Sequence, residues 1–156
     1  MATHHDGTKA QIQALNAFIT LTRAAESVNA PLERALAAAG LSISQFGTLD
    51  ALYHLGPLCQ GEISRKLLRS GGNMVMVLDN LEKRGLVRRV RDEEDRRRVP
   101  VHLTEKGRRL LSSVLPPHLD RLVSLMGELS PAELETLRGL CRKLGLQQSK
   151  AGRIKK

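Results

Sequence analysis

Arginines crowd a stretch of the chain whose two ends have the composition of short β-strands. Residues Leu86 to Leu103 read L-V-R-R-V-R-D-E-E-D-R-R-R-V-P-V-H-L, two β-prone arms around a charged turn. A guanidinium group carries several N–H donors in a fixed planar fork, which suits phosphate oxygens and base edges. We therefore predict a thin basic hairpin that can enter a narrow minor groove of duplex DNA, where negative potential is concentrated. The hairpin would carry Arg88, Arg89, Arg91, Arg96, Arg97 and Arg98.

Asp95 needs an explanation, because a carboxylate close to phosphates should repel them. It directly precedes the last three of these arginines. We expect its carboxylate to orient a neighbouring guanidinium through a charge-assisted hydrogen bond, so that the fork is held ready for the groove. The alternative is that residues 92–95 form only a solvated turn, with the arginines as its ion-pair partners. The order of strand, turn and strand directly after a helical segment favours the first interpretation.

The segment from Gly72 to Arg84 has the apolar spacing of a helix with two different faces. The stripe that should pack into the core consists of Met74, Val77, Leu78 and Leu81. The opposite surface would carry Asn73, Val75, Met76, Asn80 and Lys83. If this helix enters a major groove, Asn73 could pair with an adenine, and Val75 or Met76 could touch a thymine methyl group.

Small residues stand where the N-terminal amides of this helix have no helical partner. Ser70 and the backbone N–H groups of Gly71 and Gly72 could bind DNA phosphates there, because a helix start is positive. The plainer interpretation is that the two glycines form only a turn and that Asn73 only caps the helix. Both interpretations stay open at this point.

Charge and composition favour a duplex nucleic acid as the partner. The chain has 156 residues and a formal net charge of +9, which predicts one domain with an anionic partner. Only Phe18, Phe46 and Tyr53 are aromatic, so there is no stacking platform for single-stranded bases or RNA loops. The sequence shows neither an apolar run of membrane-spanning length nor a secretory signal pattern. We therefore expect a cytoplasmic, nucleoid-associated protein without a membrane partner.

The sequence offers no residue set typical of catalysis or metal binding. It has no glycine-rich phosphate loop, nucleophile elbow or paired catalytic carboxylates. Cys59 and Cys141 lack CxxC spacing, and the histidines are scattered. We therefore expect no enzyme activity, no metal site and no cofactor.

Helical segments flank the central part of the chain. Residues 9–40 and 105–146 have helical spacing, with Pro31 restarting the first segment and Pro116-Pro117 breaking or kinking the second. Residues 147–156 are polar and basic, which predicts a flexible tail. Between the flanks, two further helices are expected, from Ile43 to about His54 after the capping box of Ser42 and Gln45, and from Gln60 to Leu68. The expected fold class is mainly α with a small β-hairpin.

These motifs resemble the MarR family of winged helix-turn-helix transcriptional regulators. The resemblance covers residues 41–111 and is carried by L-S-I-S-Q-F, L-L-R-S-G-G-N, L-D-N-L-E-K-R-G-L-V, D-x-x-D-R-R and V-H-L-T-E-K-G. By motif position, Asp95 and Arg97 are similar to the family's paired wing residues. Ser70, Asn73 and Met76 fall where its recognition helix contacts DNA. Many members have a polar or basic residue where Met76 stands, so the operator sequence does not carry over.

The resemblance implies an assembly as well as a fold. It implies a homodimer formed by the helices at 9–40 and 105–146, a winged DNA-binding lobe at 41–104, and binding to a pseudo-palindromic operator, usually to repress. The residues point the same way, because the end segments hold more apolar surface than one small winged unit could cover. Half-sites should then lie about one helical turn apart, roughly 10 bp.

The signal is less well indicated than the DNA-binding surface. The resemblance implies a small, often aromatic ligand between the dimer helices and the lobe, and Tyr53 and His54 are candidates for contacting it. Ordinary packing is the commoner role for lone residues of these types. Cys59 stands at the expected start of the helix at 60–68, where helix amides stabilise a thiolate and oxidation would disturb the helix. A half-buried thiol in place of a Ser or Thr cap is the commoner case.

Two functions of different classes follow. The leading hypothesis is a sequence-specific DNA-binding regulator, a repressor released by a small ligand or by thiol oxidation. The alternative is a winged-helix protein-interaction module without site-selective DNA binding, whose basic surface serves an acidic partner.

Overall fold

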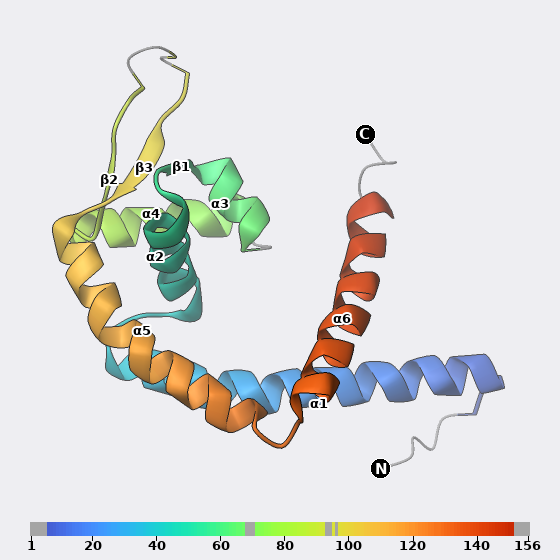
Figure 1. Cartoon of the computed structure of the whole chain (residues 1–156). Helices are drawn as coiled ribbons and strands as arrows, with labels where there is room; N and C mark the ends of the chain where they lie inside the picture. The colour runs from blue at the N-terminus through green and yellow to red at the C-terminus, as the bar shows by residue number, and fades with distance from the viewer. Residues whose placement is uncertain (1–5, 68–70, 93–94, 96, 152–156) are drawn as a thin grey trace. The chain divides into compact units, whose positions relative to one another are not determined.

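Helices and one small sheet make up the fold. The computed structural model describes residues 6–67, 71–92, 95 and 97–151, in two compact units that comprise residues 1–120 and 121–156. In chain order the elements are α1 (Lys9–Ala38), α2 (Ile43–Leu55), β1 (Leu58–Cys59), α3 (Gln60–Lys66), α4 (Gly71–Lys83), β2 (Val87–Arg89), β3 (Pro100–Leu103), α5 (Glu105–Met126) and α6 (Pro131–Ala151) (Figure 1). The predicted fold class is confirmed. Among the described residues, no helix is both long and apolar enough to span a bilayer.

The sheet contains a strand that was not expected. Its order is β1-β3-β2, and both strand pairs are antiparallel. β2 and β3 are the arms of the predicted hairpin, with Val87 opposite Leu103 and Arg89 opposite Val101. β1 pairs only Leu58 and Cys59 with the other edge of β3. A strand of two residues has no alternation to recognise in a sequence, so only the folded chain reveals it.

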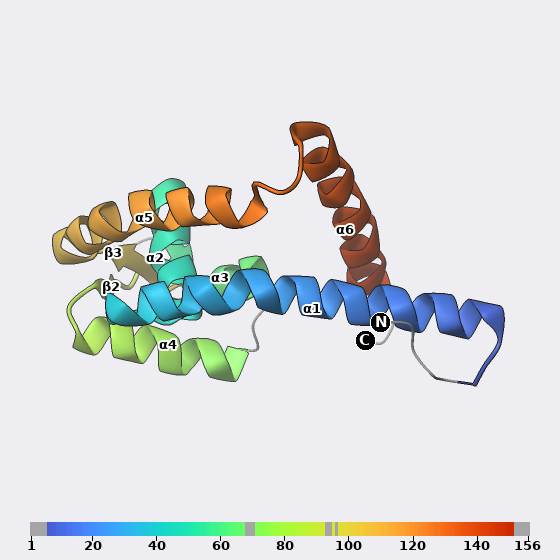
Figure 2. The same ribbon diagram turned by 90° about the horizontal axis from the view of Figure 1, so that it is seen from below.

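The core lies between α2, α4, the sheet and the beginning of α5. Its fully buried members include Leu49, Ile63, Met74, Leu78, Leu81 and Leu111. The predicted stripe of α4 is therefore confirmed, with Val77 packed at its edge. α1 reaches this core only near its C-terminal end, where Leu32 and Leu36 are buried. Its N-terminal half extends beyond the lobe (Figure 2) and leaves Phe18 64% exposed.

A close approach of main chains fixes the start of the hairpin. Gly85 ends α4 with φ of 69°, and the Leu86 N–H donates to the Leu81 carbonyl at 2.9 Å, the pattern of a left-handed helix end. Thr104 caps α5, where its hydroxyl oxygen accepts the Gly107 N–H at 3.0 Å. A Cβ at Gly107 would stand 2.1 Å from the Leu86 carbonyl oxygen. Glycine at this position therefore allows α5 to pack directly against the chain that enters β2.

Proline-containing segments differ from the prediction. α1 continues through Pro31 as one helix, so the expected restart there is wrong. α5 likewise continues through Pro116 and Pro117. A proline removes one helical N–H donor, but its φ suits a helix. Packed residues that follow the prolines keep the helical path, namely Leu32 and Leu36 after Pro31 and half-buried His118 after Pro117.

Two helix ends also differ. α6 continues to Ala151, so residues 147–151 of the expected tail are helical, while the remainder lies outside the described residues. Gln, Lys and Ala are good helix formers and can extend a helix that has already begun. A cap marks its start, where the Ser130 N–H donates to Glu133 at 2.8 Å. α3 ends at Lys66, slightly before the expected Leu68, which is not described.

Candidate nucleic-acid interface

α4 presents one face to the core and leaves the other uncovered. Met76 is 73% exposed and Val75 is 40% exposed, while Met74 between the core helices is fully buried. Asn73 also lies on the exposed surface. Asn80 is exposed as well, but its side-chain oxygen accepts a hydrogen bond from Gln45 Nε2 of α2 at 2.7 Å. The predicted contact surface of α4 is therefore open to a partner, and Asn80 in addition ties this helix to α2.

The N-terminal end of α4 begins with two glycines that nothing crowds. Gly71 and Gly72 lie inside the first turn of the helix, not in a turn before it. A Cβ added to either would meet no described atom within 4 Å. Packing among the described residues, which leave out 68–70 directly before this helix, therefore gives no reason for glycine at these two positions. Ser70, the third residue expected here, lies outside the described residues.

Of the predicted hairpin arginines that the structure describes, Arg88, Arg91, Arg97 and Arg98 are exposed and Arg89 is half-buried. Arg88 lies on the outer face of β2, and Arg97 is exposed just beyond the turn. The Asp95 carboxylate accepts the backbone N–H of Arg97 at 3.0 Å, whereas we expected it to hold a guanidinium group. The Arg98 N–H donates to the Asp95 carbonyl at 2.8 Å. In the described part of the turn, Asp95 thus shapes the backbone that carries Arg97. Arg96 is not described.

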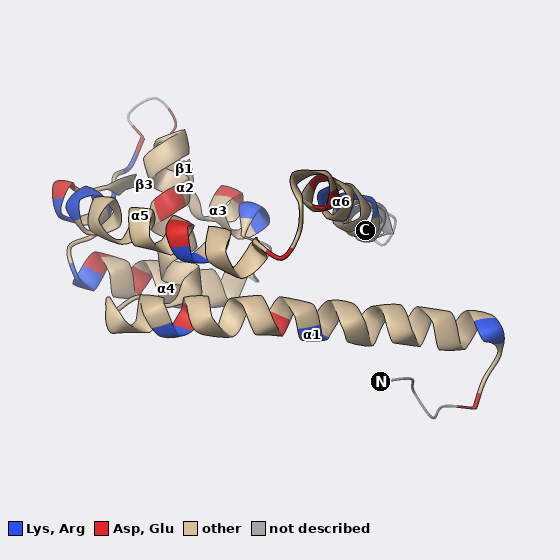
Figure 3. Ribbon diagram, turned by 60° about the horizontal axis from the view of Figure 1, so that its bottom comes forward, with Lys and Arg blue, Asp and Glu red and all other residues tan. Residues whose placement is uncertain are grey.

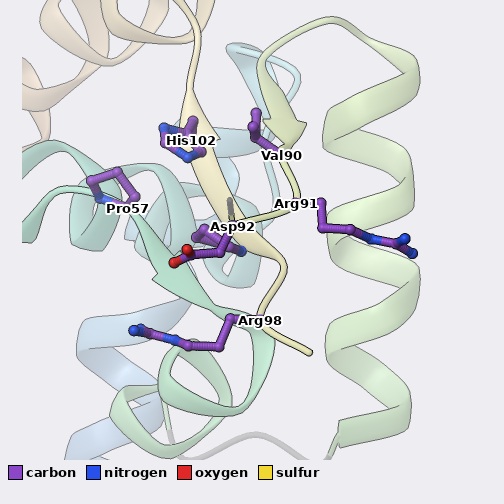
Figure 4. A pocket seen from close by; sticks show the side chains of 7 residues that line it. Pro57, Val90, Arg91, Asp92, Arg98 and His102 are labelled. Carbon is purple, nitrogen blue, oxygen red and sulfur yellow. The ribbon is translucent and has the colours of Figure 1, made fainter. Parts of the chain in front are cut away.

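Arg98 is directed to the base of the hairpin. A hydrogen bond to Cys59, reinforced by the charges of Cys59, Glu62 and Asp92, raises the pKa of the Arg98 guanidinium. Figure 4 shows the side chains of Arg91 and Arg98 pointing in opposite directions, with the Asp92 carboxylate on the same side as Arg98. Arg98 is therefore engaged with the start of α3 while it remains exposed, so its expected DNA contact stays a prediction.

A hollow of about 360 Å³ lies beside Arg98 on the outer face of the sheet (Figure 4). Its wall includes Pro57, Val90, Asp92, Pro100 and His102. The mixture of one acid, two arginines and apolar rings gives it no dominant charge. No part of this hollow was expected from the sequence, because its residues come together only when β1, β2 and β3 pair.

Arg89 is the hairpin residue whose position differs most from expectation. Its Nη2 donates to Asp79 of α4 at 2.7 Å, and its Nη1 donates to Glu82 of the same helix. Its backbone N–H donates to the other oxygen of Glu82 at 2.9 Å. The hydrogen bond from the Arg89 backbone N–H, with a smaller contribution from its guanidinium group, holds the pKa of the Glu82 carboxyl below its usual value. Arg89 therefore joins the hairpin to α4, a role that its place among the arginines of the motif did not suggest.

Cys59 lies where the sequence suggested, directly before α3 and half-buried. Its backbone N–H donates to Glu62 at 2.7 Å, which satisfies the helix start as the capping pattern predicts. The neighbouring guanidinium of Arg98 was not foreseen. Cys59 thus stands between α3 and the base of the hairpin.

Tyr53 and His54 both have protein partners. The Arg108 guanidinium lies 5.2 Å from the Tyr53 ring centre, and His54 Nε2 lies 3.3 Å from Asp50. Nearby, the ring centres of His118 and Phe46 lie 4.3 Å apart. Burial lowers the pKa of His118, although the charge of Asp50 acts in the opposite direction. Among the described residues, His118 Nδ1 is buried without a hydrogen-bond partner.

His118 was missed as a functional candidate at the α2–α5 surface. A lone histidine after two prolines gives no pattern, because only the packing of α5 on α2 brings it to Phe46. The buried nitrogen is the feature that marks it out.

Known proteins similar to this chain share its length and fold. A model described as the MarR family matches residues 39–98. The HTH-type transcriptional regulator YkoM of Bacillus subtilis is 34% identical over 134 residues, which cover 86% of this chain and 87% of YkoM.

Two solved structures extend the comparison. One is BpsR of Bordetella bronchiseptica, whose DNA binding is regulated by 6-hydroxynicotinic acid; it is 27% identical with a TM-score of 0.74, over 83% of this chain and 98% of that one. Another, a mutant MarR from Escherichia coli complexed with operator DNA, is 26% identical with a TM-score of 0.70, over 83% and 96%. Sequence and fold agree along most of the length, and the chain belongs to the MarR family of DNA-binding transcriptional regulators.

Proposed function

We propose that this regulator is a repressor that binds a pseudo-palindromic operator as a homodimer, with one lobe in each half-site. The observation that carries the proposal is the exposed face of α4 next to a basic hairpin on the same packed core. α4 would enter the major groove with Asn73, Val75 and Met76 toward the bases. The likeness to a MarR structure in complex with operator DNA supports this proposal.

Backbone contacts would set the register of each lobe. The open space at Gly71 and Gly72 suits a phosphate that approaches the helix start closely. Ser70 would add a hydroxyl group there. Arg88 and Arg97 are exposed cations of the hairpin, and we assign Arg97 to the minor groove, held by the turn that Asp95 shapes. Arg96 is kept as a further DNA contact from its place in the motif.

The second copy would cover the N-terminal half of α1. Phe18 and Leu21 are exposed there, and the stretch between Lys9 and Arg23 carries no charged residue (Figure 3). An apolar helix face of this kind is costly to leave in water. A two-fold dimer buries it and presents two α4 helices to two half-sites.

A signal would release the protein from DNA in one of two ways. A small aromatic ligand could bind near Tyr53 and His54, where buried His118 Nδ1 offers an unused hydrogen-bonding atom; the regulation of BpsR by 6-hydroxynicotinic acid supports a ligand-controlled mechanism. Oxidation of the Cys59 thiol is the other way, because it would disturb both the start of α3 and the contact with Arg98. Titration of aromatic acids and of hydrogen peroxide into a DNA-binding assay separates the two.

The test of the repressor proposal is a mobility-shift assay on the promoter beside the protein's own gene, with a scrambled duplex as competitor. Site-selective binding that weakens steeply with salt is the expected result. Replacing Arg97 by Ala should weaken specific binding by about ten-fold or more. Equal affinity for promoter and scrambled DNA would instead support a protein-interaction module. An unchanged affinity after Arg97→Ala would refute the minor-groove assignment.

A further inference from the structure

Three hydrogen bonds join Arg89 to the recognition helix at the point where the hairpin leaves the lobe. Glu82 uses one oxygen for the Arg89 backbone N–H and the other for its guanidinium, while Asp79 takes the second arm of the fork. The Arg89 side chain is only 27% exposed. The bonds hold both the main chain and the side chain of one strand residue, which an ordinary surface ion pair does not do.

We propose that Arg89 is a positioning residue that fixes the angle between the hairpin and α4, and so aligns the minor-groove contact with the major-groove contacts. This inference rests on the proposed function. Asp79 and Glu82 act with Arg89 as its anchors on α4. Together, these three residues are called the α4–hairpin clamp below.

The place of the clamp along the hairpin explains why apolar packing is not sufficient. Buried Leu86 and Val87 anchor the beginning of β2, and Arg89 is the last residue of that strand. Beyond it the arms remain joined by the Val90 N–H to the Pro100 carbonyl and the Asp92 N–H to the Arg98 carbonyl. The arms therefore move as one ribbon, of which about 10 Å extends from Arg89 to Asp92. β1 holds the β3 arm at Pro100 and Val101, and the clamp adds the polar connection between the ribbon and α4, so that without it the angle to α4 would be less firmly fixed.

The negative charges of Asp79 and Glu82 beside Arg89 argue against a direct contact between Arg89 and DNA. Two carboxylates already bind its guanidinium group. Burial lowers the pKa of Arg89, but the hydrogen bonds to these carboxylates outweigh it, and the pKa is raised. Acids on a DNA-reading helix repel phosphates. Their presence beside the hairpin is accounted for if they hold Arg89 in place.

The two explanations predict opposite effects of Glu82→Gln. If the clamp positions the hairpin, Glu82→Gln should weaken binding by about ten-fold, because the minor-groove arginine is no longer aligned. If Arg89 contacts DNA itself, the loss of a nearby negative charge should tighten binding. The probe is a duplex carrying the site that the wild-type dimer selects from a random-sequence library. Affinity is measured by fluorescence anisotropy over a range of salt concentrations.

A hydroxyl-radical footprint gives the readout that a loss of stability would not produce. Arg89→Gln and Glu82→Gln should both lose the protection in the flanking minor groove while keeping that under α4. Arg89→Lys, which keeps the charge but not the fork, should show the same partial loss. The double variant should bind no more weakly than either single variant, because both remove one shared interaction.

A matched control removes a glutamate from an exposed ion pair elsewhere. Glu135 pairs with Arg138 on α6, and Glu135→Gln should leave the footprint unchanged. Thermal unfolding of each variant identifies any that fails to fold, in which case the milder Asp79→Asn takes its place. Tighter binding by Glu82→Gln, or a uniform fading of the whole footprint, overturns the clamp but not the repressor. If the wild-type protein selects no site, both proposals fall.

Discussion

Replacing Gly107 by Ala should destabilise the lobe although alanine is the better helix former. The new Cβ would stand 2.1 Å from the Leu86 carbonyl oxygen, where contacts under 3.0 Å are essentially never found, so α5 or the entry to β2 must move by about 1 Å. The carbonyl oxygen cannot rotate away, because it accepts the Thr104 N–H at 3.1 Å.

The magnitude follows from two opposing effects. Overpacking costs about 1–3 kcal/mol, and more where main chain must yield, while the gain in helix propensity offsets about 1 kcal/mol. We expect a net loss of about 2 kcal/mol in the free energy of unfolding, which corresponds to a fall of roughly 4–8 °C in Tm for a chain of this size. Because the displaced segment begins the hairpin, specific DNA affinity should fall as well.

Urea unfolding followed by circular dichroism measures the change, with Gly61→Ala as the control. Gly61 is exposed in α3, and an added Cβ there meets no described atom within 4 Å. That variant should be more stable than wild type by up to about 1 kcal/mol. A Gly107→Ala protein as stable as wild type would refute the close approach of α5 to β2.

Three further predictions concern separate surfaces of the protein. Leu78→Ala should cost about 2–5 kcal/mol of unfolding free energy because Leu78 is fully buried. Met76→Ala on the same helix should change stability in urea by less than about 0.5 kcal/mol and alter base preference in a binding-site selection. Equal stability losses for the two variants would contradict a helix with one buried and one exposed face. The folded pKa of Glu82 lies below its ordinary value of 4.5, so its contribution to stability is present above that pH and is lost as the pH falls through the folded pKa; acid titration of unfolding should therefore be flatter for Glu82→Gln, and an identical pH profile would count against the Arg89 contact. Phe18→Glu should convert the dimer to monomer in light scattering, and a persistent dimer would exclude the N-terminal half of α1 from the interface.

Local patterns in the sequence predicted much of the lobe. The box of Ser42 and Gln45 starts α2, where the Ser42 N–H donates to Gln45 at 2.9 Å, and Gly85 ends α4 directly after the predicted segment from Gly72 to Arg84. The apolar stripe of α4 is buried as its spacing indicates. Each of these features involves residues three or four positions apart, so the information lies within one helical turn.

Contacts between distant segments could not be predicted from such short spacings. Arg88, Arg89 and Arg98 look alike in the basic motif, yet Arg88 is exposed, Arg89 binds α4 and Arg98 meets Cys59. Alternation along a strand distinguishes the two faces of β2, but it does not say that acids of α4 lie opposite one of them. The prediction at Pro31 was wrong for the same reason, since α1 continues through it where Leu32 and Leu36 pack against the lobe.

The amino-acid sequence by itself determined most of the helices, the hairpin, the charge and the family resemblance, because these depend on composition and on short spacings. Only the tertiary structure decided that Arg89 binds acidic residues of α4 and that Arg98 meets Cys59. The physical reason is that a guanidinium group binds whatever acceptor the fold brings within about 3 Å. Segments far apart in the chain supply those acceptors, and their meeting depends on how the whole core packs.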